Sequence, residues 1–130
     1  MTSFEHTFKI LVIEDIPIAS RLTRFILEKK GCLVDCVANG EEALTQCHHA
    51  YDLILLDLGL PGMDGFETAR QLRLHFQIPI IALTAKKNDR KTIALIKKYK
   101  MNGYVFKPLS DETCEILLNN LVLKKDFFCG

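Results

Sequence analysis

Apolar residues gather along this chain in five short runs, separated by amphipathic stretches. The runs are Phe8–Ile13, Leu33–Val37, Leu53–Leu56, Ile78–Leu83 and Tyr104–Phe106. Four of them are almost continuously apolar, which is typical of strands that are buried on both faces of a parallel sheet. The run Leu33–Val37 is more broken, so we expect it to form an edge of the sheet.

The stretches between the runs carry apolar residues at helical spacing. The first predicts a helix with Ile18, Leu22, Phe25 and Ile26 on its apolar face, ended by Gly31. Four more helices are expected, around residues 43–47, 66–76, 93–96 and 117–122, with Asp64 and Ser110 as N-caps of the second and fourth of these. Strands and helices thus alternate five times, which predicts an α/β fold with one doubly wound parallel sheet covered on both faces.

The length and composition fit one compact domain without a membrane segment. The chain has 130 residues, of which 48% are hydrophobic and 25% charged, and its formal net charge is +1. We assign residues 9–123 to the domain, 1–8 to an N-terminal extension and 124–130 to a C-terminal tail, and expect no separate output domain. The low net charge favours neither a directly bound nucleic acid nor a membrane. No apolar run approaches the ~18 residues that span a bilayer, so we expect no membrane insertion.

The cysteines favour a reducing compartment. Five occur, at positions 32, 36, 47, 114 and 129. Their number is odd and their spacing matches neither a zinc site nor a disulfide framework, which predicts free thiols and a cytoplasmic location.

Charged and polar residues follow the ends of several strands. Glu14 and Asp15 come after the first run, Asp57 ends the third, Thr84 follows the fourth and Lys107 follows the fifth. Because all strands of a parallel sheet end at the same edge, and ligands bind there, these side chains are expected to converge.

This set of residues suits phosphoryl transfer. Three neighbouring carboxylates repel one another, and a hard divalent cation such as Mg²⁺ relieves the repulsion while keeping room for phosphate oxygens. Lys107 adds a point charge, Thr84 a hydroxyl group, and a carboxylate can accept a phosphoryl group covalently. Asp52 begins the third strand and is expected about 16 Å from Asp57, at the opposite edge.

Four ordered motifs carry a resemblance to a known family. They are Leu11–Asp15 (LVIED), Asp57–Gly65 (DLGLPGMDG), Thr84-Ala85 and Gly103–Pro108 (GYVFKP). Together they resemble the receiver domains of response regulators and hybrid histidine kinases, over about residues 9–123. The resemblance implies a flavodoxin-like sheet with strand order 2-1-3-4-5 and five helices.

The resemblance also implies roles for the acidic residues. Asp57 looks like the phosphoacceptor, which takes its phosphoryl group from a phosphohistidine of a histidine kinase or histidine phosphotransfer domain. Asp15 resembles the direct Mg²⁺ ligand, Glu14 a neighbour that acts through water, and Gly59 the donor of a backbone carbonyl. The chain is then expected to be a phosphoacceptor switch that assists its own phosphorylation, and not an enzyme in its own right.

Three further residues match the switch of the family. Lys107 would hold the phosphoryl group, Thr84 would turn toward it, and Tyr104 would rotate inward from solvent. The Lys107-Pro108 peptide bond is expected to be cis, as in relatives.

Several alternatives remain open. A flavodoxin-like FMN binder shares the fold, but Glu14 and Asp15 would repel its phosphate. A haloacid-dehalogenase-type phosphatase needs a carboxylate at the position of Gly59. A degenerate receiver would act only as an interaction module. The motifs Leu11–Asp15 and Asn39–Leu44 favour a module of a hybrid histidine kinase over a stand-alone regulator.

The segment Lys86–Lys100 is strongly basic. It holds seven lysines and arginines against one acidic residue, Asp89. Such a run is either a solvated helix face or a docking surface for an acidic partner.

Overall fold

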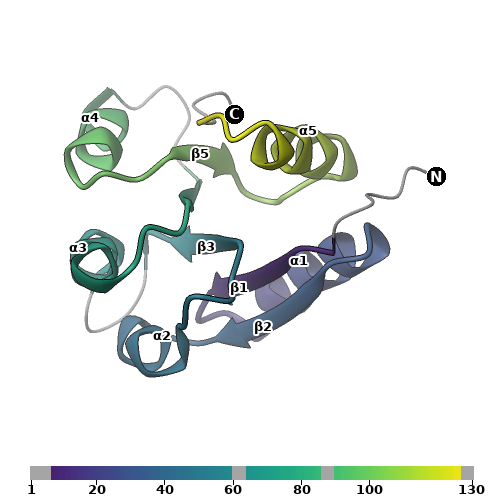
Figure 1. Ribbon diagram of the computed structural model, residues 1–130, viewed down its shortest axis with the longest axis horizontal. Coiled ribbons are helices and arrows are strands. Elements are labelled where there is room, and N and C mark those ends of the chain that lie inside the picture. Colours follow the sequence, from purple (N-terminus) through teal and green to yellow (C-terminus); the bar gives the residue numbers. More distant parts are fainter. Residues whose placement is uncertain (1–6, 60–63, 86–89, 127–130) are drawn as a thin grey trace.

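The computed structural model describes residues 7–59, 64–85 and 90–126, in which strands and helices alternate (Figure 1). In chain order they are β1 (Lys9–Ile13), α1 (Pro17–Lys29), β2 (Leu33–Val37), α2 (Gly40–Gln46), β3 (Leu53–Asp57), α3 (Gly65–His75), β4 (Ile80–Thr84), α4 (Arg90–Lys98), β5 (Gly103–Phe106) and α5 (Asp111–Val122). The strands form one parallel sheet with the order β2-β1-β3-β4-β5. The predicted fold class and strand order are confirmed, and β2 lies at an edge as expected.

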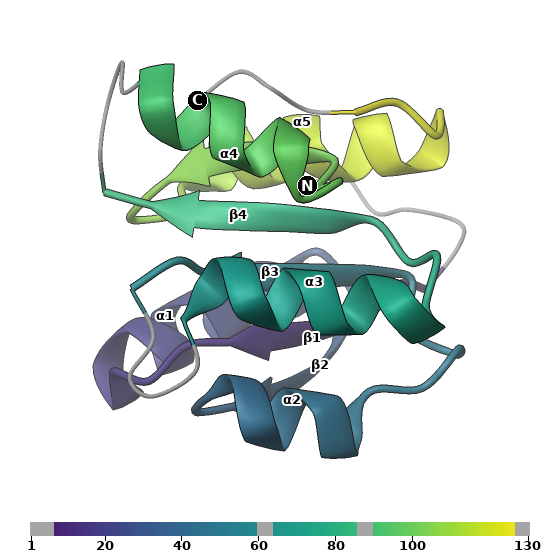
Figure 2. The same ribbon diagram turned by 90° about the vertical axis from the view of Figure 1, so that its left-hand side faces the viewer.

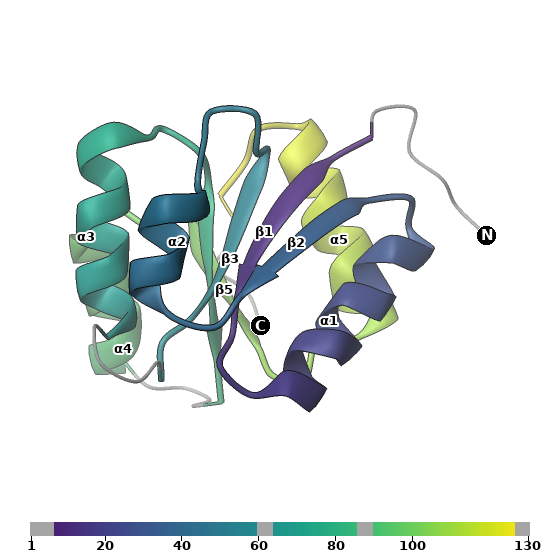
Figure 3. The same cartoon turned by 90° about the horizontal axis from the view of Figure 1, so that it is seen from below.

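Helices cover both faces of the sheet. Figure 3 shows α1 and α5 on one side and α2, α3 and α4 on the other. Alternate residues of each strand supply the two cores, so that Ile10 and Val12 pack toward α1 and α5 while Leu11 and Ile13 pack toward α2 and α3. Because both faces of the central strands are buried, their sequences are continuous apolar runs.

The fourth strand differs slightly from its predicted limits. It was expected over Ile78–Leu83 and is observed as Ile80–Thr84. Pro79 has no backbone N–H group to donate to a neighbouring strand, although its carbonyl accepts a hydrogen bond from the Ile54 N–H (2.9 Å). The observed strand therefore begins after this proline.

The apolar stripe of α1 does not face the core. Ile18, Leu22 and Phe25 are 71%, 46% and 58% exposed, and of the residues predicted on this face only Ile26 is buried. The face that packs is formed by Thr23, Ile26 and Leu27. Arg24 helps to fix this rotation, because its Nη2 donates to the Val34 carbonyl on the edge strand (2.9 Å). The helix thus presents a row of large apolar side chains to solvent.

The start of α3 is pressed against the end of β3. Asp64 caps this helix by accepting from the Glu67 N–H (2.8 Å), and Ser110 caps α5 by accepting from the Thr113 N–H (3.1 Å), as predicted. A Cβ atom on Gly65 would lie 2.7 Å from the Leu58 Cα and 2.9 Å from the Asp57 carbonyl oxygen. Only glycine fits here, so α3 begins directly beside the backbone that carries Asp57.

The cysteines in the described part of the chain, Cys32, Cys36, Cys47 and Cys114, are free thiols, in agreement with the expectation from their spacing. Cys129 lies outside the described residues. Burial raises the pKa of Cys32 and of Cys47 to about 11, which keeps both thiols protonated and unreactive near neutral pH. None of the helices in the described residues combines the length and apolar character needed to cross a membrane.

Candidate functional site

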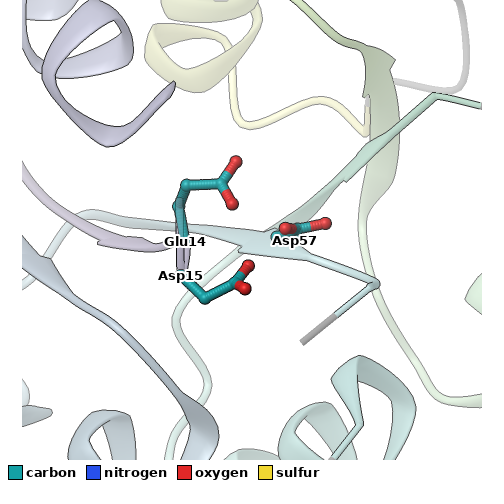
Figure 4. Close-up of side chains that lie close together, drawn as sticks. All are labelled: Glu14, Asp15 and Asp57. Carbon is teal, nitrogen blue, oxygen red and sulfur yellow. The ribbon is translucent and has the colours of Figure 1, made fainter. Parts of the chain in front are cut away.

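Three carboxylates meet at the carboxyl ends of β1 and β3 (Figure 4). Glu14 and Asp15 directly follow β1, and Asp57 is the last residue of β3. One oxygen from each carboxylate lies within 4.8 Å of the other two. Glu14 and Asp57 are buried, with only 3% and 4% of their surface exposed, whereas Asp15 is half-buried. The predicted convergence of these residues is confirmed.

Lys107 joins this cluster from the end of β5. Its Nζ lies 3.1 Å from the Asp57 Oδ2 and 3.2 Å from the Glu14 Oε1, so one ammonium group bridges two buried carboxylates. The Lys107 N–H donates to the Thr84 carbonyl (2.9 Å), which holds the end of β5 beside that of β4. The Lys107-Pro108 bond is cis, as the family resemblance implied.

Backbone N–H groups support the two buried carboxylates. The Asp57 Oδ1 accepts from the Gly59 N–H (3.0 Å), and the Glu14 Oε2 accepts from the Ile16 N–H at a longer 3.4 Å. The two Asp57 oxygens therefore face different donors, a backbone amide on one side and an ammonium group on the other.

The protonation states of the buried pair differ. Burial, together with the neighbouring Asp57, raises the pKa of Glu14 to about 7. Burial also opposes ionisation of Asp57, but hydrogen bonds from Glu14, Gly59 and Lys107 outweigh it and hold the pKa of Asp57 below its ordinary value. Burial tends to lower the pKa of Lys107, yet the attraction of Asp57 and Glu14 raises it overall. Without a cation, Asp57 is thus the carboxylate that ionises first, and Glu14 keeps its proton to a higher pH than an ordinary glutamate.

The charge balance of the cluster fits a hard divalent cation. Three ionised carboxylates and one ammonium group would leave a net charge of −2 in a largely buried place. All the acidic ligands are oxygens, the donor type that Mg²⁺ prefers. Burial and the neighbouring Asp57 raise the pKa of Glu14, as expected for a carboxylate that is costly to ionise in this place.

A cleft of about 390 Å³ opens over Asp57. The predicted residues Asp15, Gly59, Thr84 and Lys107 line it, and Thr84 is buried in its wall. Four other lining residues neighbour these strand ends: Ile16, Leu58, Leu83 and Ala85. The cleft also contains Phe66 and Thr92, which strand ends could not reveal. Phe66 and Thr92 come from α3 and α4, and the sequence alone gives no signal for them because it does not show how closely these helices approach the sheet edge.

Tyr104 lies inside the protein. Its side chain is buried and belongs to the core beneath α2, α3 and α4, with its ring centroid 5.4 Å from that of Phe106. The expected solvent-facing position of Tyr104 is therefore not the one seen here. Lys86 and the rest of 86–89, the start of the predicted basic segment, lie outside the described residues.

Asp52 lies at the opposite end of the sheet, as predicted. Its Oδ2 accepts from the N–H of Lys9, the first residue of β1 (2.8 Å). It takes no part in the acidic cluster.

Comparison with known proteins gives a consistent picture. The family model described as the response regulator receiver domain matches residues 10–119. The transcriptional regulatory protein ResD of Bacillus subtilis is 42% identical over 103 residues, which cover 78% of this chain and 42% of ResD. Probable histidine kinase 4 of Oryza sativa subsp. japonica is 33% identical over 128 residues, covering 79% of this chain and 13% of that kinase.

Solved structures agree. Full-length ShkA in complex with AMPPNP is 41% identical, with a TM-score of 0.79 over 89% of this chain and 24% of ShkA. The chemotaxis response regulator CheY4 of Vibrio cholerae is 27% identical, with a TM-score of 0.78 over 89% of this chain and 99% of CheY4. Curated relatives such as ResD and histidine kinase 4 are longer proteins, and this chain spans about half of their length or less.

The raised pKa of Glu14 predicts a pH-dependent stability of the metal-free protein. In the folded state Glu14 keeps its proton up to a pH of about 7, whereas in the unfolded state it releases the proton at its ordinary pKa of 4.5. The free energy of unfolding should therefore fall as pH rises from about 5 to 7.5. The loss should be at most about 3 kcal/mol. Urea denaturation in EDTA should show that Glu14→Gln, which mimics the protonated form, removes this part of the pH dependence. A wild type and a variant with parallel pH profiles would contradict the assignment.

Proposed function

The chain belongs to the response regulator receiver domain family of two-component systems, and we propose that it is phosphorylated on Asp57. The observation that carries this proposal is the environment of the Asp57 carboxylate. It is ionised and buried, opens onto the cleft, and is held by the Lys107 Nζ and the Gly59 N–H. No other carboxylate in the described residues combines these contacts.

The reaction moves one phosphoryl group between two side chains. An Asp57 oxygen attacks the phosphorus of a phosphohistidine, the P–O bond forms as the P–N bond breaks, and the imidazole leaves as the other product. Lys107, which already forms an ion pair with Asp57, would neutralise charge on the oxygens of the transferred phosphoryl group. Because these groups belong to the receiver itself, the chain would assist its own phosphorylation and would also accept a small phosphodonor.

Mg²⁺ is the cofactor that the acidic cluster fits. Asp15 and Asp57 would bind the ion through their carboxylates, the Gly59 carbonyl would join them, and Glu14 would act through water. The ion would neutralise charge on the phosphoryl oxygens. For this role Glu14 must lose the proton it holds without metal, so binding should be weaker below about pH 7.

Thr84 and Tyr104 are the proposed switch. Thr84 is buried in the wall of the cleft, and Tyr104 lies on β5 opposite Ala82, two register positions before the pair of Thr84 and Phe106. A phosphoryl group adds about −1.5 to −2 charge and three acceptor oxygens, one of which the Thr84 hydroxyl can satisfy. Since Tyr104 is already inside, phosphorylation would stabilise this inward arrangement against an outward one.

The partner that delivers the phosphoryl group is proposed to be a histidine kinase or a histidine phosphotransfer domain. Ile16 lines the cleft and is exposed, and the row Ile18, Leu22 and Phe25 continues from it along α1. A partner that reaches Asp57 must cover this apolar surface or leave it in water, and covering it is favourable. The exposed face of α1 is thus the natural docking surface for the donor.

The chain is further proposed to act in the cytoplasm, as a module of a hybrid histidine kinase or as a stand-alone regulator. The domain would span residues 9–123, with residues 1–8 as an N-terminal extension and 124–130 as a C-terminal tail, in line with β1 beginning at Lys9 and α5 ending at Val122. An FMN-binding role and a degenerate receiver are not favoured, since the acidic cluster and Lys107 are assembled for phosphoryl transfer.

Asp57→Asn should abolish phosphorylation by acetyl phosphate in the presence of Mg²⁺. The wild-type product should be base-labile, because acyl phosphates hydrolyse in alkali. Asp52→Asn, at the other end of β3, is the matched control and should label at the wild-type rate. Continued labelling of Asp57→Asn would show that another residue is the acceptor.

Asp15→Asn should weaken Mg²⁺ binding by at least about tenfold, because it removes a charged ligand. Isothermal titration measures this directly. Asp52→Asn should bind Mg²⁺ like the wild type, and equal affinities of all three proteins would disprove the metal assignment.

Leu22→Ser combined with Phe25→Ser should slow phosphotransfer from a phosphorylated histidine phosphotransfer domain by about tenfold, since two large apolar contacts are lost. Phosphorylation by acetyl phosphate should be unchanged. Leu74→Ser, which alters an exposed leucine on α3, is the control. A parallel loss with both donors would mean that the substitutions damage the site and not the docking.

A further inference from the structure

A groove of about 740 Å³ runs between α3 and the end of α4, on the face of the sheet shown in Figure 2. We call it the α3–α4 groove; it is lined by Arg70, Arg73, Leu74, Gln77, Lys98, Tyr99, Lys100 and Asn102. It is distinct from the cleft over Asp57, with which it shares no lining residue. Half of its lining side chains are cationic and none is acidic.

Arg73 is a fixed charge in the wall of this groove. Its guanidinium group donates to the Lys100 carbonyl (2.9 Å), the Ile78 carbonyl (2.7 Å) and the Asn102 Oδ1 (2.6 Å). These acceptors are all neutral, so the bonds position the charge without cancelling it. Burial lowers the pKa of Arg73, but an arginine remains charged near neutral pH. The Asp126 carboxylate accepts a hydrogen bond from the Asn102 Nδ2 (3.1 Å) and not from Arg73.

Lys98 and Lys100 add charges that the described residues do not neutralise. Both are exposed and neither forms an ion pair within residues 7–59, 64–85 and 90–126, although Lys98 lies over the Tyr99 ring (5.7 Å). Arg70 is different, because Glu67 holds it in a bidentate pair (2.6 and 2.9 Å). Residues 90–110 contain no acidic residue at all.

The ends of the two helices do not account for all this positive charge. Each helix C-terminus carries about half a negative charge, so α3 and α4 together offset about one cation. Arg73, Lys98 and Lys100 supply three. A net positive charge is left over, and it lies in a concave surface.

The groove also contains apolar surface. Leu74 is 66% exposed, so its side chain offers apolar surface beside the cations. Tyr99 contributes its aromatic ring, which also packs against the Phe66 ring, with the two ring centroids 5.4 Å apart. An occupant must therefore offer carboxylates to the cations and at least one aliphatic side chain to Leu74.

We propose that the α3–α4 groove binds an acidic segment of a partner protein, in which an aliphatic side chain is flanked by carboxylates. A nucleic acid fits less well, because the phosphates and sugars of its backbone offer no aliphatic side chain to cover Leu74, and the Tyr99 ring is already packed against Phe66 and Lys98. The proposal does not depend on phosphorylation of Asp57, and either proposal can fail without the other.

The test is an NMR titration of the ¹⁵N-labelled chain with the peptide acetyl-Glu-Glu-Leu-Glu-Glu-amide. Amide shifts should concentrate in residues 70–77 and 97–102. Lys98→Gln combined with Lys100→Gln should weaken the affinity by about threefold to tenfold, as expected for two exposed charge pairs. The matched control, Lys124→Gln combined with Lys125→Gln, changes two exposed lysines after α5 and should bind like the wild type.

Three results would overturn the proposal. The peptide could shift amides near Lys124 and Lys125 as strongly as those of the groove, which would show unspecific attraction. A peptide with serine in place of leucine could bind equally well, which would show that Leu74 takes no part. A short DNA duplex could bind the groove more tightly than the peptide, which would identify a nucleic-acid site instead.

Discussion

The bridge from Lys107 to Asp57 and Glu14 is the interaction on which the site depends. Two carboxylates that are almost fully buried would be costly beside each other without a positive charge, and the ammonium group at 3.1 and 3.2 Å supplies it. With one cation between two buried carboxylates, the pKa of Glu14 is raised and that of Asp57 is lowered. The same imbalance fits a divalent cation and leaves Asp57 as the more readily ionised carboxylate of the pair. Its position is secured by Gly65, which lets α3 begin in contact with the backbone of β3.

The parts of this arrangement that follow from strand ends could be predicted from the sequence. Glu14, Asp15, Asp57, Thr84 and Lys107 each lie where a buried parallel strand stops, and a parallel sheet brings such positions together whatever the details of packing. The strand order came from the family resemblance and was right. Asp52 was correctly excluded because a strand has two ends, and it directly precedes the strand that Asp57 terminates.

The parts that depend on helix rotation could not be predicted. The stripe Ile18, Leu22 and Phe25 is the more apolar face of α1, yet the face with Thr23, Ile26 and Leu27 packs. Periodicity shows that a helix has an apolar face and does not show whether the core or a partner will cover it. Phe66 and Thr92 were missed in the cleft for a similar reason, since their approach depends on how α3 and α4 lie over the sheet.

Negative and positive charge lie in two neighbouring hollows, the cleft over Asp57 and the α3–α4 groove. The Phe66 side chain lines the acidic cleft, the Tyr99 ring lines the basic groove, and their centroids are 5.4 Å apart. Both rings are only partly buried, and they pack against each other between the cleft and the groove. Arg73 holds the far end of the groove through its hydrogen bonds to Ile78, Lys100 and Asn102. An aromatic pair thus separates the acidic cleft from the cations of the groove.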